Sequence, residues 1–179
     1  MQGYVRLIKH SDCLIGAGES PEGILTTNPN SKSERRKTAL LREGVKTCSS
    51  KGLENVHSLV RGSLAEAMYM RQVRQVPVVD AARAQAFVNA EKTFQSERDQ
   101  GDQVMASVMS CMVATSPDKA HALLATQHGS TEEATAMDVF FAASQKCGAG
   151  ASRPSNLSRS FIRAFVADSA WRLARTAAR

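Results

Sequence analysis

The chain contains an internal repeat, and this repeat limits the folds open to its 179 residues more than any other feature of the sequence. Two segments carry the same kinds of residue in the same order, with cysteine, proline and aromatic positions among them. The matching pairs are Cys13 with Cys111, Pro21 with Pro117, Ser31 with Ser130, Glu34 with Glu133, Cys48 with Cys147, Arg61 with Arg163, Ala65 with Ala167, Glu66 with Asp168, and Tyr69 with Trp171. We therefore expect two copies of one unit, residues 1–75 and 100–179, joined by a connecting helix in residues 76–99.

The four cysteines are distributed two to each unit, 35 and 36 residues apart. A duplicated unit is expected to carry its own pair, which predicts the disulfides Cys13–Cys48 and Cys111–Cys147. Each bond would close a loop and, in the chain-entropy description, stabilise the folded protein by about 3–4 kcal/mol. Disulfides persist in oxidising compartments, so the pairing favours a periplasmic or secreted protein. Four buried free thiols in a cytoplasmic protein are the alternative.

The first ten residues lack the apolar region and the small-residue cleavage site of a signal peptide. A periplasmic or secreted location therefore implies a leader that is not part of this sequence. No run of residues approaches the roughly 20 apolar positions that a membrane-spanning helix needs, so we expect no transmembrane segment. The composition, with 42% hydrophobic and 22% charged residues, is that of a globular protein and excludes wholesale disorder.

Helical signals occur throughout the chain, and no segment alternates convincingly as a strand. Ser31 with Glu34, and Ser130 with Glu133, form capping-box patterns, in which the serine oxygen accepts an early backbone N–H and the glutamate reaches back toward the cap. The predicted fold class is all-α, a helical bundle of two tandem four-helix units, each with one disulfide. The long helices are expected at residues 3–15, 31–48, 56–74, 80–98, 102–114, 130–147 and 157–176, with short helices after Pro21 and Pro117.

The formal net charge is +6, and most of the positive excess lies between Lys32 and Lys46. Arg35, Arg36 and Lys37 run together there, which is typical of a contact with phosphate groups or an anionic surface. The simpler interpretation is a solvated helix face with glutamates interspersed. Aromatic residues do not alternate with these cations, as they would in a platform for single-stranded nucleic acid.

Arg61 and Arg163 occupy matching positions, and each is followed five residues later by an acid, Glu66 or Asp168. At about 100° per residue the acid lies about 140° around the helix, so a salt bridge within the helix is not expected. Each charge should find its partner on another helix or in solvent. One interpretation is a pair of sites for an anionic ligand or partner. The other is structural, and the occurrence of the arginine in both units favours it.

No motif predicts a catalytic, metal or cofactor site. The histidines at positions 10, 57, 121 and 128 never stand three or four residues apart, and the zinc-protease pattern is absent. The hydrolase pattern Gly-x-Ser-x-Gly is also absent. Gly16 and Gly18 only faintly resemble a phosphate loop and are better explained as a helix stop. We expect no metal and no cofactor, and we favour a non-enzymatic protein over an enzyme with dispersed histidine or carboxylate catalysts.

The second unit carries Cys-Met-Val at 111–113, Ser-Pro at 116–117, Gly-Ser-Thr-Glu-Glu at 129–133 and then Cys147, and the first carries Leu-Val-Arg-Gly-Ser-Leu-Ala-Glu-Ala-Met-Tyr at 59–69. This pattern resembles small secreted helical proteins of alphaproteobacteria. The resemblance implies no activity. Our leading hypothesis is a disulfide-stapled, non-enzymatic protein of the bacterial envelope that contacts another protein or an anionic surface. The alternatives are a cytosolic nucleic-acid-binding protein, which would use Arg35, Arg36 and Lys37, and the enzyme above.

Overall fold

The protein is all-α, as the sequence predicts. The computed structural model describes residues 2–44, 48, 57–148 and 154–177, and in these residues it contains nine α-helices, one 3₁₀ turn and no strand. The helices are α1 (Gln2–Gly16), α2 (Glu22–Leu25), α3 (Lys32–Gly44), α4 (His57–Gln72), α5 (Ala81–Phe94), α6 (Gln100–Thr115), α7 (Pro117–Leu124), α8 (Thr131–Ala143) and α9 (Arg159–Ala177), and the 3₁₀ turn is η1 (Gln145–Cys147).

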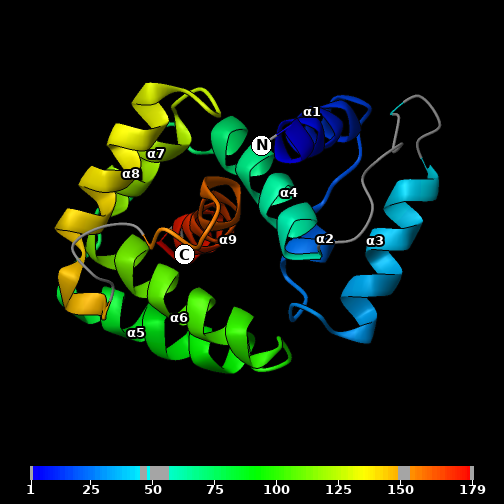
Figure 1. The fold of residues 1–179 in the computed structure, drawn as a ribbon. Coiled ribbons are helices and arrows are strands. Elements are labelled where there is room, and N and C mark those ends of the chain that lie inside the picture. The colour runs from blue at the N-terminus through cyan, green and yellow to red at the C-terminus, as the bar shows by residue number, and fades with distance from the viewer. Residues whose placement is uncertain (1, 45–47, 49–56, 149–153, 178–179) are drawn as a thin grey trace.

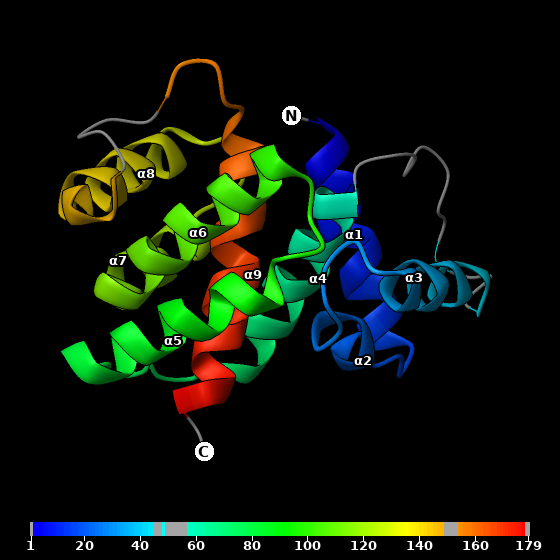
Figure 2. The same cartoon turned by 90° about the horizontal axis from the view of Figure 1, so that it is seen from below.

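Helices α4 and α9 form the centre of the molecule. Nine consecutive residues of α4, from Arg61 to Tyr69, are buried, and burial in α9 is just as continuous from Ile162 to Trp171. A helix that is buried on all sides has to be covered by other elements. Figures 1 and 2 show α1, α2 and α3 on the α4 side and α5, α6, α7 and α8 on the α9 side.

The two central helices touch at Gly62 and Ala164. A Cβ atom added to Gly62 would lie 2.4 Å from the Ala164 Cβ and 2.5 Å from its Cα. The absent side chain therefore allows the two backbones to meet. Each of these residues directly follows the matched arginine of its own helix, so the contact brings Arg61 and Arg163 close to the opposite helix.

The capping boxes begin α3 and α8 as expected, with one difference. The Glu34 N–H donates to Ser31 Oγ at 3.1 Å, and the Glu133 N–H donates to the oxygen of the matching serine at 3.0 Å. Each glutamate carboxylate, however, accepts from the residue before the serine, Asn30 or Gly129. Both of these residues have a positive φ, 67° and 82°. This backbone turn points their N–H groups at the carboxylates.

Two predicted helices are shorter than expected. The connecting helix ends at Phe94, because Gln95 and the following turn separate it from α6, whose first turn is capped by Asp99. The helix predicted at 130–147 ends at Ala143 and is followed by η1. Residues 45–47 of the helix predicted at 31–48 lie outside the described residues.

The cysteines pair as the sequence predicts. The sulfur atoms of Cys13 and Cys48, and those of Cys111 and Cys147, lie at disulfide-bond distance. The structure gives the two halves the same order of helices, but a single core includes residues of both. The duplication and the boundaries at residues 75 and 100 therefore remain sequence-based predictions. Within the part of the chain that the structure describes, no helix is both long and apolar enough to span a bilayer.

Candidate functional site

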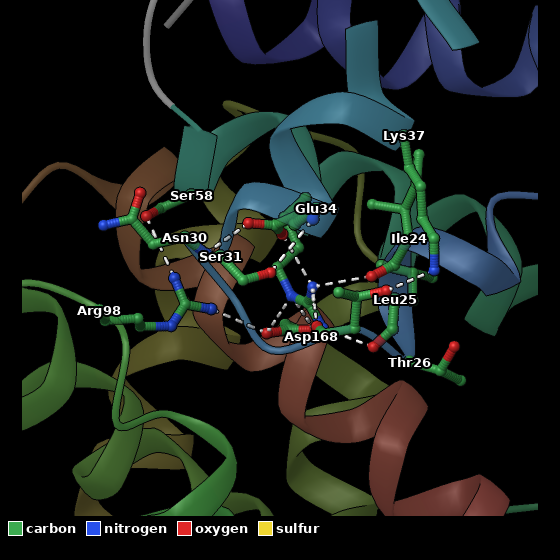
Figure 3. Close-up of polar contacts among 12 residues, drawn as sticks. Ile24, Leu25, Thr26, Asn30, Ser31, Glu34, Lys37, Ser58, Arg98 and Asp168 are labelled. Carbon is green, nitrogen blue, oxygen red and sulfur yellow. Dashed lines mark hydrogen bonds and ion pairs between the residues drawn. The ribbon is translucent and has the colours of Figure 1, made fainter. Parts of the chain in front are cut away.

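Arg61 lies at the centre of the first of two buried arginine clusters. Its Nε donates to both carboxylate oxygens of Asp168 on α9, at 2.9 and 3.0 Å. Its Nη1 donates to Glu34 of α3 at 2.8 Å. The remaining hydrogen bonds go to backbone carbonyl oxygens at the end of α2, those of Ile24, Leu25 and Thr27. The side chain thus caps α2 and joins it to α3 and α9. Figure 3 labels its partners Ile24, Leu25, Glu34 and Asp168.

Arg163 makes the same set of contacts in the second cluster. Its guanidinium donates to Glu66 of α4, with a shortest distance of 2.7 Å, and to Glu133 of α8 at 3.2 Å. It also binds the end of α7, through the carbonyl oxygens of Leu123, Leu124 and Thr126. The ion pairs are therefore crossed: the arginine of α4 uses the acid of α9, and the arginine of α9 uses the acid of α4.

The two acids experience different electrostatic surroundings. Burial would raise the pKa of Asp168, but Arg61 and Arg98 outweigh this and hold it below its ordinary value. Burial raises the pKa of Glu66, because Arg163 and the hydrogen bond from Tyr4 offset it only in part and the nearby Glu133 carboxylate repels its charge. The first cluster therefore stabilises its central carboxylate more strongly than the second.

These contacts show that Arg61 and Arg163 bind groups inside the protein and not groups at its surface. Both residues are 2% exposed, so neither guanidinium is presented to an outside anion. The expectation that each charge finds its partner away from its own helix is confirmed. The interpretation of Arg61 and Arg163 as contacts for an anionic ligand or partner is not supported, because their donors are occupied inside the protein. Each of them joins four helices: Arg61 connects α4 to α2, α3 and α9, and Arg163 connects α9 to α4, α7 and α8.

Arg98 is a member of the first cluster that the sequence analysis missed. It lies in the turn after α5, outside any repeat match, and is 6% exposed. Its Nη2 donates to Asp168 at 3.0 Å, and its Nη1 donates to Ser58 Oγ at 3.2 Å. Ser58 in turn donates to Asp102 at the start of α6. The only sequence signal for this arrangement is a mismatch in the repeat, since Asp102 stands where the first unit has Tyr4.

A polar pocket of about 240 Å³ opens beside Arg98. Buried charged side chains contribute to its wall: Glu34, Arg61 and Arg98. The rest of the lining comes from more exposed polar groups, Asn30, His57, Ser58, Asp99 and Asp102. The pocket therefore joins three separate parts of the chain, residues 30–34, 57–61 and 98–102. Figure 3 shows Asn30, Ser58 and Arg98 grouped beside Glu34 and Asp168 of the Arg61 cluster.

The cations singled out in the sequence lie on the exposed side of α3. Arg35, Arg36 and Lys37 are all exposed. Arg35 donates to the Asn30 side chain at 2.9 Å, and Lys37 donates to the Gly23 carbonyl oxygen at 2.8 Å. The nearest glutamate in sequence, Glu34, is 3% exposed and faces Arg61, so it does not balance these charges at the surface.

The histidines do not gather into a site. His128 has its Nδ1 3.4 Å from Glu133 Oε1 and packs edge-on against Tyr4, and burial lowers its pKa. His121 shares a hydrogen bond of 3.2 Å with Tyr69 OH. Across residues 2–44, 48, 57–148 and 154–177, no group of three or more His, Cys, Asp or Glu side chains is placed to hold a metal ion.

Two parts of the described surface gather charged side chains: the basic side of α3 and the polar pocket beside Arg98. The first presents positive charge on one helix. The second encloses groups of both signs from several helices. No known protein family, curated protein or solved structure matches this chain.

Proposed function

We propose that this protein is a non-enzymatic, disulfide-stapled helical protein of the bacterial envelope that binds an anionic partner surface through α3. The observation that carries the proposal is the charge of the exposed side of that helix. Lys32, Arg35, Arg36 and Lys37 are exposed, and the described exposed residues of α3 include no carboxylate. A run of exposed cations on one helix attracts phosphate-bearing and other anionic surfaces.

Two disulfides support the location of the proposed function. Bonds of this kind persist in oxidising compartments and are rare in the cytosol. One of them joins α1 to Cys48, shortly after α3, so the basic helix is covalently held near the rest of the fold. A helix held in this way presents its cations in a fixed arrangement.

The expected strength of binding follows from the number of cations. Each lysine or arginine close to an anionic membrane contributes about 1 kcal/mol, so four contribute about 4 kcal/mol at low salt. Salt weakens such contacts because the screening length is about 8 Å at physiological ionic strength. Binding should therefore be weak, of low specificity for the headgroup, and strongly dependent on salt.

The test compares two double charge reversals of equal size. K32E/R36E changes two exposed α3 residues that make no hydrogen bond to any described residue, and R83E/K92E makes the same charge change on α5. With vesicles containing phosphatidylserine, we expect K32E/R36E to lose at least about tenfold in partitioning, while R83E/K92E loses about threefold or less. Equal losses would show that net charge alone drives binding. Binding to duplex DNA but not to vesicles would favour the nucleic-acid alternative.

A further inference from the structure

The two arginine clusters make matching contacts at their centres but differ at one edge. In the second cluster the Tyr4 side chain is 2% exposed, donates to Glu66 Oε2 at 3.2 Å and packs against the His128 ring. The matching position in the first cluster is Asp102, whose side chain is much shorter. The polar pocket lies beside Asp102. An aspartate in place of a buried aromatic ring leaves the space that the pocket occupies.

The groups around this space are held in place before any ligand arrives. Arg98 is fixed by Gln95, Ser58 and Asp168. Asp99 Oδ1 caps α6 by accepting from the Asp102 N–H at 3.0 Å. A site whose polar groups are fixed by packing and hydrogen bonds loses less entropy on binding. The volume of about 240 Å³ lies below the range of drug-sized pockets, about 300–1,000 Å³, and so suits a small molecule.

The charges of the pocket favour a cation. The guanidinium groups of Arg61 and Arg98 are balanced by the carboxylates of Asp168 and Glu34, with which Arg61 forms ion pairs. Asp99 and Asp102 add two further carboxylates, and among the residues that the structure describes only Asp102 of the two forms an ion pair, 3.6 Å from Arg98. Within the described part of the chain, one oxygen of each of these two carboxylates accepts no hydrogen bond.

We propose that this pocket binds a small organic cation that carries N–H donors, such as a protonated amine, between Asp99 and Asp102. An ammonium group has donors for both open carboxylate oxygens, whereas a carboxylate ligand would meet repulsion from them. Asn30 also faces the pocket, and its side-chain N–H groups donate to no described residue, so they can bind a polar atom on the remainder of the ligand. The proposal does not rest on the exposed cations of α3, although Glu34 of the same helix lines the pocket.

Isothermal titration calorimetry at low ionic strength tests the proposal with three probes of similar length: 1,4-diaminobutane, butylamine and butyrate. We expect both amines to bind the native protein, the diamine more tightly, and butyrate not to bind. D99N/D102N should weaken amine binding at least tenfold. D80N/D138N is the matched control, because Asp80 caps α5 as Asp99 caps α6, and Asp138 is an exposed acid on α8.

A second variant, D102Y, introduces the tyrosine that the other cluster has at the matching position, Tyr4, and should fill the pocket. Its fold is checked by circular dichroism and by the fluorescence of Trp171. Loss of amine binding in folded D102Y or in D99N/D102N, with the control unchanged, supports the proposal. Unchanged amine affinity in D99N/D102N would overturn it. Butyrate binding in place of amine binding, or no heat with either amine at millimolar concentration, would overturn it as well. None of these outcomes bears on vesicle binding by α3.

Discussion

The contact between α4 and α9 leads to a prediction whose sign is opposite to that of helix propensity. Replacing an internal helical glycine with alanine ordinarily stabilises a protein by about 1 kcal/mol. At Gly62 the added Cβ would lie 2.4 Å from the Ala164 Cβ and 2.6 Å from its carbonyl oxygen. Non-bonded carbon atoms are best placed about 3.5–4.0 Å apart, so the two central helices must separate by about 1 Å or more.

The cost of this separation can be placed within a range. Overpacking of a well-packed core costs about 1–3 kcal/mol and occasionally more. The crossed ion pairs of Arg61 and Arg163 join the same two helices, with contacts of 2.9 and 2.7 Å, and widening the contact stretches them. A hydrogen bond to a charged group is worth about 1.5–3 kcal/mol. After the propensity gain is subtracted, we expect G62A to lose about 2–4 kcal/mol, or about 4–15 °C in melting temperature.

Urea unfolding of the oxidised protein measures this loss. Trp171 is the only tryptophan and is 1% exposed, so its fluorescence reports on the core. G3A is the control, because a Cβ added to Gly3 meets nothing within 4 Å. The double variant G62A/A164G should remain destabilised, because the Ala164 backbone stays too close to the new Cβ. If G62A proves as stable as the native protein, the close approach of α4 and α9 is wrong.

Three further predictions concern the ion pairs, a disulfide and a tyrosine. D168N should lower the free energy of unfolding by about 3–5 kcal/mol, more than E66Q does, because Asp168 pairs with two arginines. The pKa of Asp168 is lowered in the folded protein, so its contribution to stability is complete above an ordinary aspartate pKa of about 3.9 and is lost as the pH falls below it. The acid dependence of urea unfolding should therefore be weaker in D168N. C111S/C147S should lose about 4 kcal/mol of unfolding free energy. The unmodified protein, unfolded without a reducing agent, should react with no thiol reagent, whereas four reactive thiols would refute both bonds. Burial raises the pKa of Tyr69 to about 12. Tyrosinate absorbance should therefore be absent near pH 10.0 in the native protein and appear at that pH in urea. The same titration curve in both conditions would contradict the burial of Tyr69.

The features that could be predicted from the sequence are local or depend on the repeat. Ser31 and Ser130 cap their helices through contacts with a residue three positions away, so the pattern alone is sufficient. The cysteine pairing followed from the assumption that each unit carries its own bond. The offset of about 140° between Arg61 and Glu66 correctly predicted a partner outside the helix.

The features that could not be predicted depend on how the two halves meet. Nothing in the sequence links Arg61 to Asp168, which is 107 residues away. Arg98 lies in a turn, where no periodicity marks a residue as buried. Glu34 lies among the basic residues of α3, yet the helix turns it inward to Arg61, which leaves the exposed side more basic than the sequence suggested. The pocket lies where Asp102 replaces the tyrosine of the other unit and where Arg98, outside the repeat, enters the first cluster, and its volume depends on how these parts pack.

The crossed ion pairs also bear on the order in which the chain can fold. Arg61 needs the carboxylate of a residue 107 positions further along, and Glu66 needs a guanidinium 97 positions further along. During synthesis, the first half therefore leaves the ribosome with a charged pair that cannot yet be buried at low cost. Its core can close only after the last helix has emerged. Pairings this distant slow folding, so the two halves complete their folding together, once α9 has been synthesised.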